Sequence, residues 1–141
     1  MTFNTIGIEI TERVFLNNGK KLRDILLDLR AKGYKILIDD FGTGYNSLMS
    51  ISEISFDIIK IDKYFIDRLN EVEIKVLVKH IIEFIHEMGG MIIAEGVETK
   101  EQFGVLKELG CDMIQGYYFS KPLLPEEFAK YYDAFDMNNY I

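Results

Sequence analysis

The feature that most constrains the fold of this 141-residue chain is its repeated alternation of short apolar strands with amphipathic helices. The pattern predicts strands at residues 6–10, 35–39, 57–62, 91–95 and 112–119. Helical spacing of apolar residues predicts helices over 20–31, 73–88, 99–109 and 126–134. Strand–helix–strand order favours a parallel sheet with right-handed crossovers, and strands that are apolar almost throughout are typical of strands covered on both faces. The sequence therefore predicts an α/β fold.

Local signals place the ends of these helices. Gly33, Gly89 and Gly110 each follow an amphipathic run, where a glycine commonly ends a helix. Thr99 and Gln102 have the spacing of a capping box at the start of the helix over 99–109. We expect the C-terminal tail DMNNYI, residues 136–141, to be frayed.

Composition excludes some partners. The chain has 16 basic and 23 acidic residues, a formal charge of −7, which argues against binding to DNA or to a membrane surface, since both need a basic footprint. No apolar run reaches the roughly 18 residues of a membrane span. A single cysteine, Cys111, rules out an internal disulfide framework and suits a reducing cytoplasm, and its apolar surroundings predict a packed core thiol.

Polar residues stand at or near the end of each predicted strand. They are Glu9, Asp39, Asp40, Lys60, Glu95 and Gln115. In α/β barrels the catalytic groups collect at the carboxyl ends of the strands, because the loops there converge on one mouth. Helix caps or solvated loop charges would account for one or two of these residues, but five successive strands of this kind favour a site.

The residue types indicate the chemistry of that site. Carboxylates with an amide oxygen suit Mg²⁺ or Mn²⁺, and His80 and His86, six residues apart on one helix, do not share a face for zinc. The neighbours Asp39 and Asp40 could both bind metal only where the strand gives way to a loop. Two ions about 3.5–4 Å apart would suit displacement at phosphorus, with Lys60 orienting water or offsetting phosphoryl charge.

A glycine-containing loop follows the acid pair. It comprises Phe41, Gly42, Thr43, Gly44 and Tyr45. Its GxG spacing alone is weak evidence for phosphate binding, so we expect a lid over the mouth. Glu12 is a candidate partner for the backbone of this loop.

These residues together resemble the EAL-domain family. The resemblance runs from about residue 6 to 132 and rests on Glu9-Ile-Thr-Glu12, Asp39-Asp40-Phe-Gly-Thr-Gly-Tyr45, Ile-Lys60-Ile-Asp62-Lys63, Ala-Glu95-Gly-Val-Glu98-Thr99 and Gln115-Gly-Tyr-Tyr-Phe-Ser-Lys-Pro122. Members of this family are bacterial phosphodiesterases that hydrolyse cyclic di-GMP to the linear dinucleotide on a (β/α)8 barrel of the TIM type.

The resemblance implies a role for each site residue. Glu9, Asp39 and Asp40 would be metal ligands, and Lys60 would position or activate the attacking water. Glu95 and Gln115 would support the metal-site network, and Glu12 would anchor the lid loop.

Two expected metal ligands are absent from the 141 residues. The Glu-Ala-Leu tripeptide that names the family does not occur, nor does the asparagine of the family's third strand. A full barrel needs roughly 250 residues. The resemblance therefore implies that residues 1–141 form the C-terminal part of one domain, strands four to eight of a partial barrel.

These departures set the functional expectations. We expect weak or no hydrolysis of cyclic di-GMP by this chain alone, and a homo-oligomer that covers the exposed barrel edges. The alternatives are a degenerate, non-catalytic module for nucleotide or protein binding or dimerisation, and an enolase-like barrel with carboxylates, Mg²⁺ and a lysine base. The adjacent Asp39 and Asp40 disfavour the enolase-like barrel, whose ligands come one from each strand.

Overall fold

The structure, a computed structural model, describes residues 7–42, 51 and 54–140, without the side chains of residues 12–13 and 15–19. It is built on a five-stranded parallel sheet in the order β1-β2-β3-β4-β5. Among the described residues the sheet is open, with β1 and β5 at its two edges. The predicted α/β fold with five βα units of a barrel is confirmed. None of the helices in the described residues is long and apolar enough to cross a membrane.

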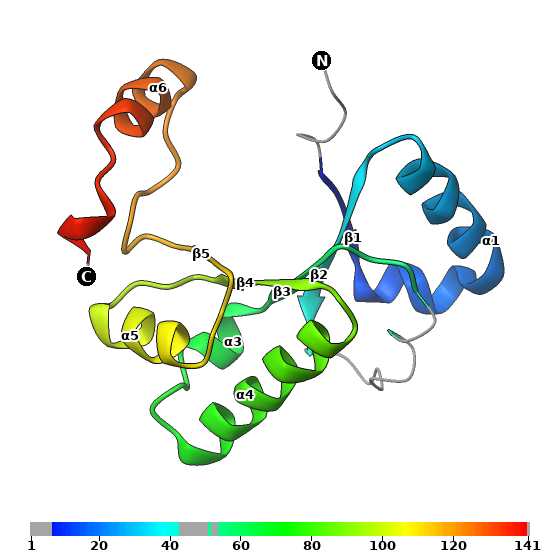
Figure 1. Cartoon of the computed structure of the whole chain (residues 1–141), viewed down its shortest axis with the longest axis horizontal. Coiled ribbons are helices and arrows are strands. Elements are labelled where there is room, and N and C mark those ends of the chain that lie inside the picture. Colours follow the sequence, from blue (N-terminus) through cyan, green and yellow to red (C-terminus); the bar gives the residue numbers. More distant parts are fainter. Residues whose placement is uncertain (1–6, 43–50, 52–53, 141) are drawn as a thin grey trace.

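The elements follow one another as the sequence predicts, with differences at their ends. The strands are β1 (Gly7–Thr11), β2 (Lys35–Phe41), β3 (Ile58–Ile61), β4 (Met91–Glu95) and β5 (Met113–Gln115). The helices are α1 (Glu12–Ala31), α3 (Lys63–Ile66), α4 (Val72–Glu87), α5 (Lys100–Glu108), α6 (Pro125–Ala134) and the 3-10 helix η2 (Met137–Asn139). Figure 1 shows α3, α4 and α5 together on one side of the sheet, α1 beside its β1 end, and α6 beyond β5.

The register of the strands separates two faces of the sheet. Residues paired across parallel strands point to the same side, and successive residues alternate. One face packs under the helices and is fully buried, with Ile36, Ile38, Ile59, Ile61, Ile92 and Ala94 each at most 2% exposed. The opposite face carries Leu37, Ile58 and Met91, of which Met91 is 40% exposed. The helices thus cover one face of the sheet and leave the other partly open.

Helix α1 begins earlier than predicted. The expected start at residue 20 was wrong, because α1 runs from Glu12. The run Asn17, Asn18 and Gly19 consists of poor helix formers, yet α1 continues through it. A helix nucleated on either side can extend through such a run, since elongation costs less than a new nucleus.

The last strand is much shorter than predicted. The expected strand over 112–119 was wrong beyond Gln115, where β5 ends. The chain turns at Gly116, and the backbone N–H of Tyr118 donates to the carbonyl of Val97 (3.0 Å). The β-forming aromatic residues that suggested a longer strand instead form a cluster, in which Tyr118 stacks on Phe103 at 5.7 Å between ring centroids.

The C-terminal tail is structured, contrary to the expected fraying. It forms the 3-10 helix η2 over Met137–Asn139. Tyr140 then packs on Phe119, with 4.9 Å between ring centroids, and its carbonyl accepts a hydrogen bond from the Tyr118 hydroxyl (3.2 Å). These aromatic contacts hold the tail, a stabilisation that no local sequence signal shows.

The predicted capping box and the glycines predicted to end three helices are confirmed. Thr99 and Gln102 form a reciprocal capping box at α5. Gly33, Gly89 and Gly110 follow α1, α4 and α5 with positive φ angles of 93°, 79° and 80°. Glycine adopts this conformation without the steric cost that a side chain brings.

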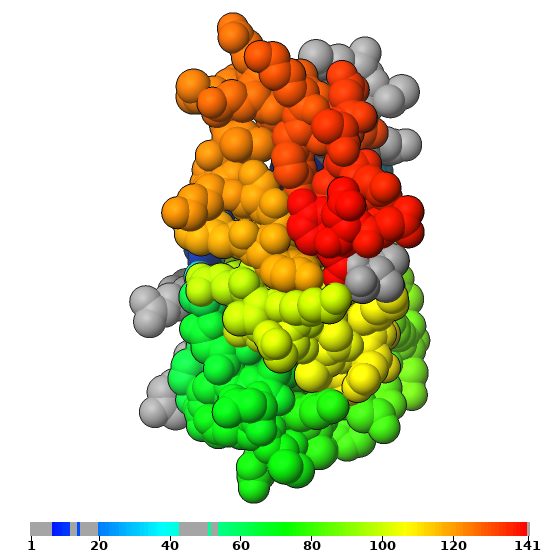
Figure 2. Space-filling model, turned by 90° about the vertical axis from the view of Figure 1, so that its left-hand side faces the viewer, coloured from blue at the N-terminus to red at the C-terminus, as the bar shows by residue number. Residues whose placement is uncertain are grey.

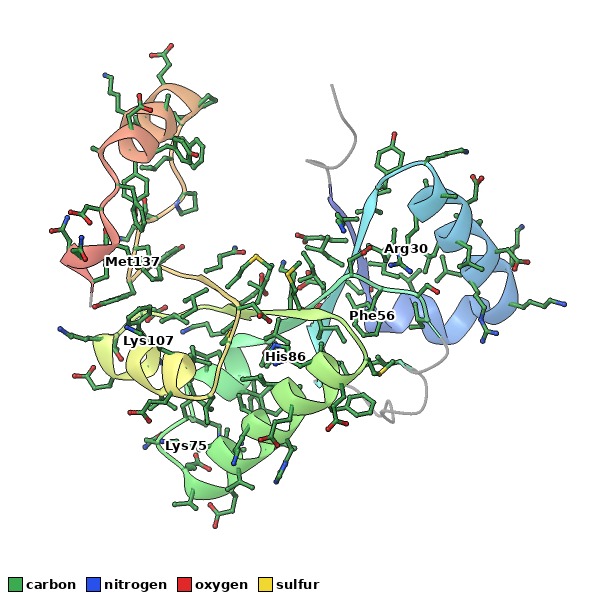
Figure 3. All side chains as sticks on the ribbon, viewed as in Figure 1. Arg30, Phe56, Lys75, His86, Lys107 and Met137 are labelled. Carbon is green, nitrogen blue, oxygen red and sulfur yellow. The ribbon has the colours of Figure 1, made fainter. Side chains whose placement is uncertain are left out.

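Two aspartates brace the amino ends of alternate strands. Asp57, just before β3, accepts from the backbone N–H of Ile36 (2.9 Å) and from both Nε and Nη2 of Arg30 (3.2 and 3.1 Å). Asp112, just before β5, accepts from the N–H of Ile92 (2.8 Å) and lies 2.8 Å from Nε2 of His86. Each carboxylate therefore ties a strand to the neighbouring strand and to the preceding helix; Figure 3 labels Arg30 on α1 and His86 on α4.

The environment of Asp57 favours its charged form. Desolvation acts to raise its pKa, but the hydrogen bond from Ile36 and the charge of Arg30 outweigh that cost and lower the pKa below its ordinary value. The stability gained from this depressed pKa is present at neutral pH and is lost as the pH falls through the pKa of the folded state.

Replacing Asp112 should destabilise the fold. We expect Asp112→Ala to lower the free energy of unfolding by about 1–3 kcal/mol, because the N–H of Ile92 loses its acceptor. Urea denaturation measures this. Asp24→Ala, an exposed aspartate on α1, is the matched control and should change stability by less than about 0.5 kcal/mol. Equal effects of the two substitutions would contradict the bracing role.

Cys111 is a packed thiol, as predicted. Its Sγ donates to the carbonyl of Met113 (3.2 Å), and burial raises its pKa to about 11. Only the thiolate reacts rapidly with alkylating reagents. At pH 8 we therefore expect iodoacetamide to modify Cys111 about 100-fold more slowly in the folded chain than in urea, given the ordinary value of 9.0. A rate within a factor of three of the unfolded rate, followed by mass spectrometry, would show that the thiol is not packed in this way.

Candidate functional site

Lys60 lies at the centre of a cluster of carboxylates at the carboxyl end of the sheet. Its Nζ is 2.6 Å from Oε1 of Glu95, 3.1 Å from Oε2 of Glu9 and 3.3 Å from Oδ1 of Asp39. The four residues come from β3, β4, β1 and β2, so four neighbouring strands meet at one point. The cluster stands on the face opposite the helices, as the parallel register requires.

The Lys60 ammonium stays protonated at neutral pH. Its side chain is only 7% exposed, and desolvation acts to lower its pKa. Hydrogen bonds to Glu95 and Glu9 and the charges of Glu95 and Asp39 outweigh desolvation and raise the pKa above its ordinary value. Lys60 in this state can orient a water molecule or offset negative charge, but it cannot serve as a general base.

The acid pair Asp39 and Asp40 lies on a bulge within β2. The predicted strand, in contrast, ended at Asp39. Strand β2 continues to Phe41, and its pairing with β3 shifts between Ile38 and Phe41. Asp40 has a φ of 57°, in the left-handed region that few residues other than glycine, asparagine and aspartate adopt. The extra residue places Asp39 on the open face and Phe41 in the core under the helices.

Asp40 lies beside the cluster. Its backbone N–H donates to Oδ1 of Asp39 (3.0 Å), the oxygen that also faces Lys60. The turned backbone of Asp40 therefore helps to hold the Asp39 carboxylate. Bulges and positive φ angles of this kind concentrate at functional sites.

Gln115 neighbours Glu95 in the register of β4 and β5. Its side chain is exposed, and it is outside the group of carboxylates that contact Lys60. Its backbone carbonyl accepts from the N–H of Val97 (3.1 Å), two residues after Glu95. Gln115 is thus tied to the loop that follows Glu95 through its backbone.

The structure leaves several predicted site residues undecided. Glu12 is the first residue of α1, and its side chain lies outside the described part of the chain. Thr43, Gly44 and Tyr45 also lie outside the described residues, so the lid and its anchor stay predictions. Of the same loop, Phe41 is buried at 4% exposure, and Gly42 packs against Phe65, where an added Cβ would lie 2.6 Å from the ring.

Sequence reasoning missed a second ion-pair group beside the site. Lys63 Nζ lies 3.1 Å from Glu98 and 2.7 Å from Asp67, and it donates to the carbonyl of Gly96 (3.4 Å). Lys63 and Glu98 line a cavity of about 690 Å³ together with Glu95, Gln115, Tyr117 and Lys121. The sequence signal that could have identified this side of the cavity is a second acidic residue, Glu98, three residues after Glu95.

The chemical type of these side chains suits a hard divalent cation. Glu9, Asp39 and Glu95 offer carboxylate oxygens, the ligands that Mg²⁺ and Mn²⁺ prefer. Within residues 7–42, 51 and 54–140, however, no three carboxylate, imidazole or thiol groups are spaced to hold one ion. The described carboxylates are thus of the type that a hard cation prefers, and in this structure they face the Lys60 ammonium.

A parallel α/β sheet with acids and a lysine converging at the carboxyl ends of its strands is the arrangement found at the mouth of α/β barrels. The comparison with known families gives the particular class. The EAL domain model matches residues 2–122, and the chain belongs to the EAL domain family.

One curated relative and two solved structures illustrate the similarity. The "Probable cyclic di-GMP phosphodiesterase PdeB" of Escherichia coli (strain K12) is 40% identical over 126 residues, which cover 89% of this chain and 24% of that protein. The EAL enzyme Bd1971, in a form bound to cAMP and cyclic-di-GMP, superposes with a TM-score of 0.88 at 37% identity, over 92% of this chain and 35% of that one. The manganese/cy-diGMP complex of Klebsiella pneumoniae BlrP1 gives a TM-score of 0.81 at 31% identity, over 86% and 31% of the two chains.

The shared region is a minor part of these relatives. The chain spans between 15% and 24% of the length of the curated relatives it matches. What is similar is therefore the five-stranded part of the domain with its strand-end residues, and the activity of the whole relatives is not thereby shown for this chain.

Proposed function

We propose that this chain carries part of a metal-dependent cyclic di-GMP phosphodiesterase site, with weak or no turnover by the chain alone. The observation that carries the proposal is the Lys60 ammonium held within 3.3 Å of carboxylates from three other strands, in a chain of the EAL family. The ligand and manganese named for the BlrP1 complex, and the activity named for PdeB, support it by similarity. The absent Glu-Ala-Leu and third-strand asparagine support the weak turnover.

Each residue of the site would have a distinct task. Glu9, Asp39 and Asp40 would hold Mg²⁺ or Mn²⁺, which would supply a Lewis acid and lower the pKa of bound water. Lys60, permanently charged, would orient the attacking water and offset charge on the phosphoryl oxygens. Glu95 would fix the Lys60 ammonium through their 2.6 Å contact, and Gln115 would support the loop after Glu95.

Calorimetry and product analysis on the 141-residue chain test the proposal. We expect cyclic di-GMP to bind in the presence of Mn²⁺, and Asp39→Ala to weaken that binding at least tenfold, while Asp24→Ala leaves it unchanged. Chromatography should detect little or no linear dinucleotide. Absence of any Mn²⁺-dependent binding would refute the site, and rapid turnover abolished by Asp39→Ala would refute the expected weakness.

Two alternative functions are a non-catalytic binding module and an enolase-like barrel. A non-catalytic module that binds nucleotide or protein would bind cyclic di-GMP or a partner with no dependence on Asp39 and Mn²⁺, so the same calorimetry distinguishes it. An enolase-like barrel needs a lysine that can lose its proton near neutral pH. The raised pKa of Lys60 argues against that mechanism.

We further propose that the chain acts in the cytoplasm as a homo-oligomer, as one domain corresponding to strands four to eight of the barrel. The packed Cys111 thiol is compatible with a reducing compartment. The homo-oligomer stays a prediction, which the mass of the chain in light scattering would test.

A further inference from the structure

The turn that follows Glu95 is built on a left-handed glycine. Gly96, the residue after the end of β4, has a φ of 71°, a conformation that glycine adopts without steric cost. An added Cβ at Gly96 would lie 2.6 Å from Cγ and 2.7 Å from Cδ of Lys63, so the stem of that lysine packs directly on the turn. In Figure 2 the yellow-green loop after β4 borders the green region of α3 and α4.

The Lys63 ammonium contacts the same turn. Its Nζ donates to the carbonyl of Gly96 (3.4 Å) and lies 3.1 Å from Oε1 of Glu98. A further partner, Asp67, comes four residues after Lys63, with its Oδ1 at 2.7 Å. Lys63 therefore joins two residues of the loop after β4 to the start of α3.

Other contacts hold the rest of this loop. Val97 donates from its backbone N–H to the carbonyl of Gln115 (3.1 Å) and accepts at its own carbonyl from the N–H of Tyr118 (3.0 Å). The capping box of α5 holds the end of the loop. On the side that faces α3, within the part of the chain that the structure describes, the contacts of Gly96 come from Lys63.

Lys60 and Lys63 reach two consecutive residues, Glu95 and Gly96, from one strand–helix junction. Lys60, in β3, places its Nζ 2.6 Å from Oε1 of Glu95. Asp62 then caps the start of α3 with its side chain, which fixes the direction in which the chain leaves the strand. Lys63 follows at once and donates to the carbonyl of Gly96. The place of the Glu95 carboxylate therefore depends on the turn that Lys63 contacts.

The loss of Lys63 should affect the site more than the stability of the chain. Lys63 and Glu98 are 44% and 49% exposed, and ion pairs exposed to this degree contribute little to stability. A displacement of about 1 Å in a positioned site, in contrast, can cost on the order of 100-fold in function.

We propose that Lys63 is a positioning residue, which holds the turn at Gly96 and thereby keeps the Glu95 carboxylate against Lys60. Lys63 acts through the backbone of the loop and through Glu98. Its effect on ligand binding rests on the proposed function, whereas its effect on the position of Glu95 does not.

Nuclear magnetic resonance of the folded chain, without metal or nucleotide, tests the positioning. Lys63→Met should shift the ε-CH2 resonance of Lys60, because Glu95 moves away from the Lys60 ammonium. Lys79→Met is the matched control, since Lys79 is 54% exposed and pairs with Glu83 on its own helix (3.7 Å), and it should leave the resonance in place. Both variants should melt within about 4 °C of the wild type. An unchanged Lys60 resonance in Lys63→Met would overturn the proposal.

A second pair of variants shows which partner of Lys63 matters. Glu98→Gln weakens a contact with the loop, whereas Asp67→Asn weakens the closest ion pair and leaves both loop contacts. Glu98→Gln should shift the Lys60 resonance in the same direction as Lys63→Met, and Asp67→Asn should leave it in place. Equal shifts from the two substitutions would refute the action through the loop.

Calorimetry with Mn²⁺ and cyclic di-GMP then measures the consequence for the site. Lys63→Met should weaken the binding at least about tenfold, and Lys79→Met should leave it unchanged. Unchanged binding by Lys63→Met would contradict the role of Lys63 in the site. A wild-type chain that binds no nucleotide would refute the proposed function instead, and the Lys60 resonance would still decide whether Lys63 positions Glu95.

Discussion

The variant Lys60→Met is expected to lose about 3 kcal/mol of unfolding free energy at pH 7, because the removed ammonium leaves three converging carboxylates without their counter-charge. The size of the effect follows from burial, since the Lys60 side chain is 7% exposed and Glu95 and Asp39 are 20% and 23% exposed. Glu9, at 50%, is better screened and contributes less. Urea denaturation at several pH values measures the loss.

The pH dependence separates charge from packing. The pKa of Lys60 is raised in the folded chain, so the stability that its charge gives is fully present at pH 7 and is lost as the pH rises through the folded pKa. The deficit of Lys60→Met relative to wild type should therefore shrink as the pH rises above 10.5. Lys63→Met is the matched control, because Lys63 is 44% exposed and should cost less than about 1 kcal/mol. A deficit independent of pH would mean that Lys60 matters through packing alone.

Among glycine-to-alanine substitutions in the described residues, Gly116→Ala should lower the free energy of unfolding the most. A Cβ at Gly116 would lie 2.0 Å from the carbonyl oxygen and 2.3 Å from the nitrogen of Val97, and both are backbone atoms that cannot turn away. We expect a loss of about 3 kcal/mol or more, with separation of Gln115 from the loop after Glu95.

A second glycine provides the control for that substitution. Gly104 lies within α5, and an added Cβ would meet nothing within 4 Å. Gly104→Ala should therefore stabilise the chain by about 0.5–1 kcal/mol, through the higher helix propensity of alanine. Thermal unfolding followed by circular dichroism distinguishes the two variants, and similar melting temperatures would contradict the close approach at Gly116.

Much of the site could be predicted because strand alternation is local. Glu9, Asp39, Lys60 and Glu95 each stand near the end of an apolar strand, and parallel strands bring such ends to one edge. Their meeting at one edge of the sheet therefore followed from residue type and position. That Lys60 is the centre of the group did not follow, because the strand register and the bulge at Asp40 determine which atoms approach.

Other features had no local signal. The residues after Gln115 have high strand propensity, yet the contact of Gly116 with Val97 turns the chain and gathers the aromatic residues into a cluster. The aspartate braces join residues 20 or more positions apart, as in Asp112 with Ile92. Such contacts depend on which strands become neighbours.

The sequence by itself determined the order of strands and helices, the ends of three helices, and the set of polar residues at the carboxyl ends of the strands, because these depend on periodicity, capping and glycine within a few residues. Only the tertiary structure decided that β2 continues through a bulge, that β5 stops at Gln115, that Lys60 is held as a cation by three carboxylates, and that Lys63 packs on the turn at Gly96. The physical reason is that each of these depends on distances between strands, which the register and twist of the whole sheet set.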